Sequence, residues 1–284
     1  MVRAVRTIYC LFSGGRDSAA ACFIAKRVAD MRGWGFKLVH VNTGIRLPGV
    51  GEYVRAYAEW LGAELVELHA KIDYWDGVMR WGYPTLWRNR WCIEWLKQRP
   101  LFEYFMRVYK PMDLVVMGIR QGESLFRLSE FTRAFYRHCH KKYGVCMNYW
   151  LPVLHAGDAV INALIRRYGI PTSPVWQRVG ISGECMCMAG TTKSTLIKII
   201  RNYPEFMRWM AERDAEVQKK RYSKKPTYPA PLYYDKITLH EFVNTVLRNT
   251  YIDEYVTGET QYVGKPCQGT CILGGPTTTD WGQS

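Results

Sequence analysis

Residues 11–20 read LFSGGRDSAA and join a predicted strand to a predicted helix. The apolar run at 5–12 indicates a buried strand, and apolar residues recur at helical spacing from 17 to 31. A glycine pair between them lets backbone N–H groups approach an anion closely, and the helix dipole adds positive potential there. On its own the stretch fits two interpretations, an anion-binding loop or a plain turn in which Asp17 caps the helix.

Strands and helices alternate beyond this loop, which indicates parallel strands joined by right-handed crossovers. We therefore expect an α/β fold built on a parallel sheet. Further strands are predicted at 36–41, 64–69 and 113–119, with a short apolar segment near 149–152. Helices are predicted at 51–61, 92–109 and 157–168, followed by a long basic helical region at 194–220.

The segment KKPTYPAPLYY at 224–234 contains three prolines and is typical of a linker. We place a domain boundary there, with an α/β domain at 1–225 and a small C-terminal appendage at 226–284. The appendage has one predicted helix at 238–248. Its tail is rich in Gly, Thr and Pro and contains Cys267 and Cys271.

The chain is strongly basic, with 39 Lys and Arg against 25 Asp and Glu and a formal charge of +14. Such a charge favours polyanionic partners, either nucleic acid or nucleotides. Tryptophans and arginines interleave between 80 and 99, a pattern that suits base stacking or core packing with Arg–Trp contacts. Because no apolar stretch approaches the roughly 20 residues of a membrane span, and the N-terminus lacks a signal-peptide pattern, we expect a cytoplasmic protein.

Nine cysteines in a cytoplasmic chain argue against disulfides and for metal, redox or core roles. Cys10 and Cys22 lie in apolar periodic segments, so we expect both to be core residues. The segment RHCHKKYGVC at 137–146 has a spacing that could bind metal, but we interpret it as a solvated basic loop because no apolar frame surrounds it.

The string S-G-G-x-D-S after an apolar strand resembles the pyrophosphate loop of the N-type ATP pyrophosphatases, and no G-K-[ST] follows as in a Walker loop. Further segments in the same order resemble the phosphoadenylylsulfate (PAPS) reductase-like branch of the adenine nucleotide α-hydrolase superfamily, and the resemblance spans residues 8–215. These segments are VNTG (41–44), RWCIEWLKQRPL (90–101), GIRQGES with Arg127 (118–127), YWLPVLHAGDAVINALIRRYGIPTSPVW (149–176) and SGECMCMAG (182–190).

This resemblance implies a Rossmann-like sheet with helices on both faces and a ligand at the carboxyl ends of its strands. It also implies ATP with Mg²⁺ as cofactors. The expected nucleotide-binding residues are Ser13, Gly14, Gly15, Arg16, Asp17, Ser18, Asn42, Thr43, Gly44, Gly118 and Arg120. The expected catalytic residues are Asp17, Arg120 and Arg127, because guanidinium groups bind phosphate or sulfate bidentately. Salt bridges from the two arginines to Glu123 or Glu130 are the alternative.

Enzymes with this loop typically cleave ATP between the α and β phosphates and transfer AMP to an oxygen. The chain keeps Asp17 and Ser18 and lacks the Glu-Cys-Gly-Leu-His-like tail of the sulfonucleotide reductases. We therefore favour adenylylation for sulfur transfer from a separate sulfur donor, with tRNA or DNA as the nucleic-acid substrate. The alternatives are a reductase that converts activated sulfate to sulfite, and a nucleic-acid-binding module with a vestigial loop. The resemblance is compatible with a homodimer.

Adenylylsulfate reductases hold an iron–sulfur cluster with an adjacent cysteine pair and a later C-x-x-C. Here Cys92 matches the first member of the pair, Ile93 replaces the second, and Cys185 and Cys187 take the place of the later pair. Cys267 or Cys271 could supply a fourth thiolate. A zinc site made by Cys185, Cys187, Cys267 and Cys271 fits the ligand types equally well.

Overall fold

The computed structural model describes residues 6–85, 89–123, 125–233 and 235–248. Its centre is a six-stranded sheet in the order β3-β2-β1-β4-β6-β5. Neighbouring strands are parallel, except that β5 runs antiparallel to β6 at one edge. The predicted Rossmann-like α/β fold is therefore confirmed, with one antiparallel strand that we did not predict. The strands are β1 (Thr7–Leu11), β2 (Gly35–Asn42), β3 (Glu64–His69), β4 (Leu114–Met117), β5 (Phe135–His140) and β6 (Val145–Trp150).

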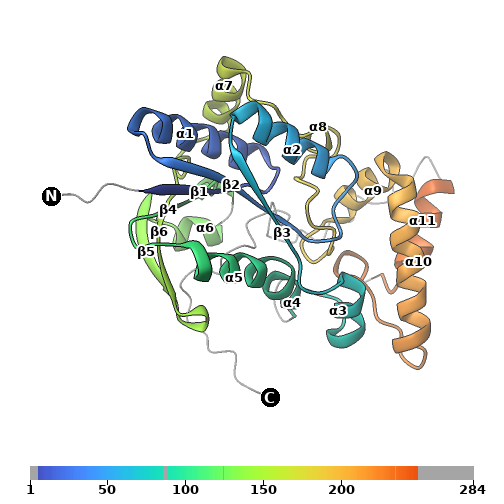
Figure 1. Ribbon diagram of the computed structural model, residues 1–284. Helices are drawn as coiled ribbons and strands as arrows, with labels where there is room; N and C mark the ends of the chain where they lie inside the picture. The colour runs from blue at the N-terminus through green and yellow to red at the C-terminus, as the bar shows by residue number, and fades with distance from the viewer. Residues whose placement is uncertain (1–5, 86–88, 124, 234, 249–284) are drawn as a thin grey trace.

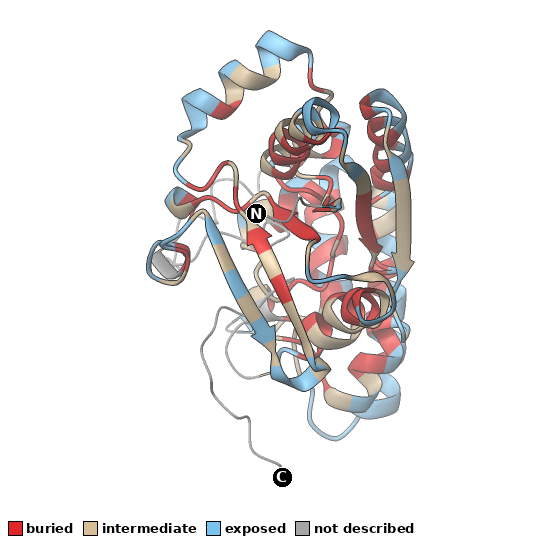
Figure 2. Cartoon of the chain, turned by 60° about the vertical axis from the view of Figure 1, so that its left-hand side comes forward, coloured by how far each residue is buried: buried red, intermediate tan, exposed pale blue. Residues whose placement is uncertain are grey.

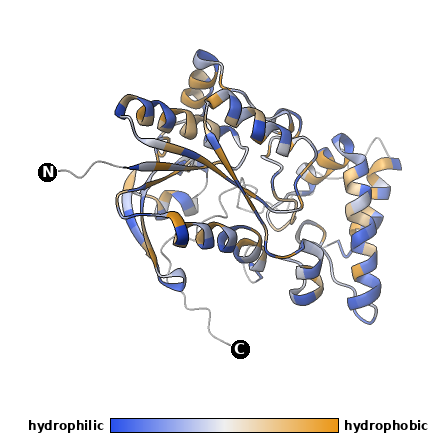
Figure 3. Cartoon of the chain, viewed as in Figure 1, coloured by the Kyte–Doolittle hydropathy of each residue, from blue (hydrophilic) through white to orange (hydrophobic). Residues whose placement is uncertain are grey.

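Helices cover both faces of the sheet (Figure 1). On one face lie α1 (Arg16–Arg32), α2 (Val50–Leu61) and α7 (Asp158–Tyr168), and on the other lie α5 (Arg99–Val108) and α6 (Leu125–Glu130). Successive residues of β1 enter the two different cores: Ile8 and Cys10 belong to one, Tyr9 and Leu11 to the other. This alternation is what a strand buried on both faces requires. Figure 3 shows that the surrounding helices carry both hydrophilic and hydrophobic residues.

The helix predicted at 92–109 is continuous but not uniform. It begins as α4 (Trp91–Ile93), widens into a π-helical segment (Glu94–Gln98) and continues as α5. The remaining elements are α3 (Tyr74–Trp81), α8 (Pro174–Val179) and the 3₁₀ segments Gln121–Glu123, Lys141–Tyr143 and Ala230–Leu232.

The long helical region predicted at 194–220 consists of two helices, α9 (Lys193–Asn202) and α10 (Pro204–Arg221). The break falls at Tyr203 because Pro204 has no N–H to continue a helix and instead begins the next one. The helix predicted at 238–248 is present as α11 (Leu239–Arg248) and packs against α10 and α9. The boundary at residue 225 stays a prediction. None of the described helices combines the length and the apolar character that a membrane crossing demands.

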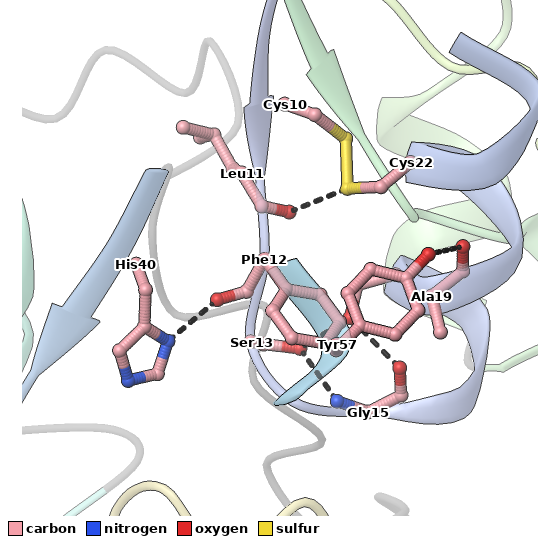
Figure 4. The surroundings of a disulfide bond; sticks show 10 residues. Cys10, Leu11, Phe12, Ser13, Gly15, Ala19, Cys22, His40 and Tyr57 are labelled. Carbon is pink, nitrogen blue, oxygen red and sulfur yellow. Dashed lines mark hydrogen bonds between the residues drawn. A yellow bond between two sulfur atoms is a disulfide. The ribbon is translucent and has the colours of Figure 1, made fainter. Parts of the chain in front are cut away.

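The expectation that the chain would have no disulfides is wrong, because two are present. Cys10 and Cys22 are core residues as predicted, but they are bonded to each other. Cys10 lies on β1 and Cys22 on α1, so the bond joins the strand and the helix that flank the glycine loop (Figure 4). Both sulfurs are removed from solvent, because both residues are fully buried.

The basic loop predicted at 137–146 is also wrong: the segment is a β-hairpin closed by a disulfide. Cys139 on β5 lies directly opposite Cys146 on β6, and these two residues are bonded. The turn between the strands ends at Gly144, whose φ of 62° favours glycine. One side of β5 does find an apolar frame, since Phe102 of α5 packs against the His140 ring.

Candidate nucleotide site and thiol cluster

The glycine loop lies at the N-terminus of α1, at the carboxyl end of the central strand β1. Gly15 is the N-cap residue, and it provides no side chain to the free N–H groups of the first helical turn. The Ser13 and Ser18 hydroxyls lie 3.1 Å apart, and the Gly15 N–H donates to the Ser13 hydroxyl at 3.4 Å. The first turn of α1 therefore presents unsatisfied donors and a positive dipole end, which suit an anion.

Two arginines and two aspartates form a closed ring of ion pairs beside this loop. Asp17 contacts Arg16 through one carboxylate oxygen (3.1 Å) and Arg120 through the other (2.9 Å). Asp158 contacts the same two guanidinium groups, Arg120 at 2.9 Å and Arg16 at close range. The hydrogen bond from Arg16 and the charge of Arg120 lower the pKa of Asp158, although its side chain is 64% exposed.

Arg16 and Arg120 have further partners that hold their orientation. Arg16 lies over the Trp176 ring at 5.3 Å and donates to the Asn162 side chain at 3.1 Å. Arg120 is 5% exposed and donates to the Ala156 carbonyl at 3.2 Å. The predicted residues Arg16, Asp17 and Arg120 thus lie together, from elements more than 100 residues apart in the chain.

Arg127 follows the alternative interpretation, because its guanidinium pairs with Glu123. Both side chains are buried. Burial lowers the pKa of Arg127 to about 10, although the nearby Asp17 carboxylate opposes that change. Arg127 therefore lies near the ring of ion pairs but is not a member of it.

The predicted turn at 42–44 follows β2, so it lies at the same edge of the sheet as the glycine loop. Asn42 accepts from the Gly44 N–H at 3.0 Å. Thr43 is fully buried and faces Glu184: its N–H donates to the Glu184 carboxylate at 2.9 Å, and its hydroxyl donates to the Glu184 carbonyl at 2.5 Å. The side chain of Thr43 therefore holds the cysteine segment 182–190 in place.

We did not identify the buried pair His40 and Glu184 from the sequence. The Nδ1–H of His40 donates to the Phe12 carbonyl at 2.8 Å, and its Nε2 lies 2.9 Å from a Glu184 carboxylate oxygen. Phe12 directly precedes the glycine loop, as Figure 4 shows. A chain of polar contacts thus joins this loop, the 42–44 turn and the cysteine segment. A histidine within the mostly apolar segment FKLVHV and a glutamate beside the cysteines were the available signals.

The cysteines at 92, 185 and 187 come together from two distant segments. The Cys187 thiol interacts with the thiols of both Cys92 and Cys185. Cys185 lowers the pKa of Cys187, but Cys92 and burial outweigh this and raise it to about 12. The hydrogen bond that Cys185 donates to Cys187, together with burial, raises the pKa of Cys185 well above its usual value. The three form what we call the thiol cluster.

Lys97 is a buried cation beside the thiol cluster, and it lies in the π-helical segment. Burial lowers the pKa of the Lys97 ammonium, but Cys185, Cys187 and Glu184 raise it by more. Thiolates are soft sulfur ligands, and zinc and iron–sulfur centres prefer such ligands. The positive charge of Lys97 beside the cluster favours the deprotonated thiolate form that binds a metal. Within the described ranges no three His, Cys, Asp or Glu residues are arranged to hold a metal ion. Cys267 and Cys271 lie outside the described residues.

Together, the parallel sheet and the glycine loop after its central strand β1 define a Rossmann-like α/β protein whose loop meets a helix N-terminus, an arrangement that suits an anion. Residues 7–208 match the phosphoadenosine phosphosulfate reductase domain. Because this match covers most of the chain, the protein belongs to that family, as the order of its motifs predicted.

Individual relatives are distant. The chain is 31% identical over 119 residues to the uncharacterized protein MJ0973 of Methanocaldococcus jannaschii, a match to 41% of this chain and 26% of that protein. The chain therefore spans about a quarter of that relative's length. Among solved structures, it is similar to the U34-tRNA thiolase NcsA from Methanococcus maripaludis with its 4Fe–4S cluster (12% identity, TM-score 0.49, 76% and 74% coverage). It is also similar to the PAPS reductase from Candida auris in a phosphate complex (14% identity, TM-score 0.44, 60% and 76% coverage).

Proposed function

We propose that the protein is an ATP pyrophosphatase-type enzyme that activates a nucleic-acid substrate, tRNA or DNA, by adenylylation for sulfur transfer. The observation that carries this proposal is the ring of Arg16, Asp17, Arg120 and Asp158 at the N-terminus of α1. Family membership and the intact S-G-G-R-D-S loop support it.

In the proposed reaction an oxygen of the acceptor attacks the α-phosphorus of ATP. The bond from that phosphorus to the bridging oxygen breaks, and pyrophosphate leaves with the electron pair. A sulfur nucleophile then replaces the oxygen that carries AMP, and AMP leaves. Such transfers depend on positioning and on neutralisation of the phosphate charge more than on a dedicated base.

The loop N–H groups and the two serine hydroxyls would bind the departing pyrophosphate. Each guanidinium of the ring is held by carboxylates, and both carboxylate oxygens of Asp17 are engaged. A nucleotide phosphate would compete for Arg16 and Arg120 and release Asp17 to bind Mg²⁺, which would neutralise the leaving group. Asp158 would then remain to orient the two arginines.

The thiol cluster would hold an iron–sulfur centre or zinc, and a bound metal would offer a coordination site for the sulfur nucleophile. The contacts of Glu184 with both Thr43 and His40 support this assignment, because they fix the cysteine segment against the nucleotide turn.

The test is pyrophosphate release from ATP in the presence of unmodified tRNA or of DNA, each with a sulfide donor. We expect Asp17→Asn to lower the rate about 100-fold or more, as loss of a charge-stabilising group in an active site does. Asp30→Asn is the matched control, because Asp30 lies on the same helix and, among the residues that the structure describes, pairs only with Lys26 at the surface. Its rate should equal that of the wild type.

Two outcomes would overturn the proposal. One is unchanged turnover of the folded Asp17→Asn protein. The other is sulfite release from adenylylsulfate with a dithiol reductant and no pyrophosphate release from ATP, which would identify a reductase.

A further inference from the structure

The outer side of the β5–β6 hairpin is a part of the sheet that no described helix covers. Because side chains alternate along a strand, Phe135, Arg137 and Cys139 share this side of β5. Their directly opposite partners on β6 are Trp150, Asn148 and Cys146. In Figure 2 the hairpin faces the viewer, with no described helix in front of it. We call these six residues the hairpin face.

An exposed aromatic pair lies at one end of the hairpin face. The rings of Phe135 and Trp150 are stacked, with centroids 5.5 Å apart and planes within 7° of parallel. Trp150 packs against the core, whereas Phe135 is 61% exposed. The phenyl ring therefore rests on the indole and leaves its other side to solvent. A flat exposed ring of this kind is a stacking surface for a base.

The same segment carries positive charge without negative charge. No Asp or Glu occurs between 131 and 157, where the cations are Arg133, Arg137, Lys141 and Lys142. Arg133 and Arg137 are exposed, and neither forms an ion pair with a carboxylate of the described residues. Lys142 instead reaches Glu94 on the opposite side of the sheet. Two arginines without a carboxylate partner among the described residues lie within two residues of the exposed Phe135 ring in the chain. This combination suits a single-stranded nucleic acid, because the guanidinium groups can bind its phosphates and the ring can stack on a base.

The aromatic pair lies at the edge of the sheet that carries the nucleotide site. Trp150 is the last residue of β6, which is parallel to β4, and the glycine loop follows β1 on the other side of β4. β5 is three strand positions from β1, so Phe135 lies about 14 Å across the sheet from the strand that ends in the loop. A few nucleotides of an extended strand span that distance.

We propose that the hairpin face binds single-stranded nucleic acid, with a base stacked on Phe135 and backbone phosphates on Arg133 and Arg137. This inference rests on the proposed function in one respect: the bound strand would place the group that is adenylylated at the glycine loop. A second copy of the chain fits this face less well, because a two-fold contact would place the same exposed arginines of both copies in one interface.

The experiment is fluorescence anisotropy of the full chain with labelled 12-nucleotide single-stranded RNA and DNA, measured without ATP over a salt series. We expect Arg133→Glu/Arg137→Glu to weaken binding at least tenfold and to reduce the slope of log K against log salt by about two. Phe135→Ala should weaken binding at least fivefold with the salt slope unchanged, because the ring contributes stacking and no charge.

Arg107→Glu is the charge control, because Arg107 is exposed on α5 on the other side of the sheet. Met31→Ala is the apolar control, because Met31 is 72% exposed on α1. Both should bind like the wild type. Thermal unfolding of each variant shows that it is folded.

Equal affinity of wild type, Phe135→Ala and the double arginine variant would overturn the inference. A change in sedimentation behaviour of these variants without a change in affinity would identify the face as a contact between copies. Because nucleic-acid binding is measured without ATP, a failed adenylylation reaction would not change the binding result. Conversely, if substitutions on the hairpin face left pyrophosphate release unchanged, the proposed function would still stand.

Discussion

Gly118 allows the first turn of α1 to approach β4 closely. A Cβ atom at this position would lie 2.5 Å from the Ser18 Cα and 2.6 Å from the Ser18 nitrogen. These are backbone atoms of the turn that follows the glycine loop, so they cannot move aside as a flexible side chain would. The sequence suggested that Gly118 belongs to the nucleotide site, and the structure gives a packing reason for glycine there.

We expect Gly118→Ala to push α1 away from β4 and to disturb the loop. Overpacking of this kind costs about 1–3 kcal/mol, which corresponds to a decrease of several degrees in Tm. ATP affinity measured by calorimetry should fall as well. Gly122→Ala is the matched control, because no atom lies within 4 Å of a Cβ there, and its Tm and ATP affinity should match the wild type.

Single residues of the site differed in how far the sequence could predict them. Asp17 and Arg120 follow two neighbouring parallel strands, so topology alone places them at one edge. The partner of Arg127 was harder to predict, because the sequence allowed either a ligand or the nearby Glu123. In the structure Arg127 pairs with Glu123. The His40–Glu184 contact needed the three-dimensional path of segment 182–190, which no local pattern records.

Asp214 links α10 to α11 and to the segment that follows α3. It lies on α10, is fully buried, accepts from the Tyr83 hydroxyl and accepts from the Leu239 N–H at 3.1 Å. The contact with Leu239 holds the first residue of α11 against α10. Burial raises the pKa of Asp214, although the hydrogen bonds it accepts act in the opposite direction.

The raised pKa of Asp214 makes its contribution to the free energy of unfolding larger at low pH than at high pH, whereas a salt-bridged carboxylate contributes more at high pH. Since the folded-state pKa is raised above the usual value of about 3.9, the folded state binds the proton more tightly than the unfolded state. The contribution is fully present below pH 3.9 and is lost as the pH rises through the folded-state pKa. Compared with Asp214→Asn, which cannot titrate, the wild type should gain relative stability as the pH falls from 7 to 4.5. The measurement is the Tm difference between the two proteins at both pH values, and a constant difference would contradict the assignment.

The elements with strong periodicity were predictable, and the hairpin was not. Strands β1, β2 and β4 are nearly continuous apolar runs, as strands buried on both faces must be. β5 instead reads FYRHCH, with one side of the strand exposed and polar groups on both sides. Its strand character comes from pairing with β6 and from the packing of His140 against Phe102 of α5, and a local reading of the sequence contains neither.

At the scale of the whole molecule, the seven cysteines of the described residues divide into a bonded set and a thiol set. Four are paired in disulfides, and Cys92, Cys185 and Cys187 are free. The sequence placed Cys10 and Cys22 in the core but could not pair them, because a cytoplasmic setting was assumed. Its prediction that Cys92, Cys185 and Cys187 would meet agrees with the thiol cluster, although metal binding there stays a prediction.

We expect anaerobic reconstitution of the full chain with iron and sulfide to give visible charge-transfer absorption. Cys92→Ala and Cys187→Ala should abolish this absorption, because each removes a central thiol of the cluster. A partial loss of absorption in Cys267→Ala or Cys271→Ala would identify the tail as the source of a fourth ligand. Cys139→Ser/Cys146→Ser is the control, because these two cysteines are bonded to each other on the hairpin face and do not belong to the thiol cluster. This variant should keep the absorption. A colourless protein with stoichiometric zinc would contradict the iron–sulfur assignment and leave the ligand set standing.

The bond between Cys10 and Cys22 also restrains the glycine loop that lies between them. It closes residues 10–22 into a covalent ring, so α1 cannot swing away from β1 to open a gate on that side. The bond therefore restrains the loop in the free protein, and a loop that binds a nucleotide as proposed would lose little chain freedom on binding. Among the described residues, the arginine–aspartate ring lies at the carboxyl edge of the sheet beside the loop, and its contacts are reversible ion pairs. We therefore expect the rate of nucleotide binding to depend on exchange of these ion pairs, so it should rise with salt concentration.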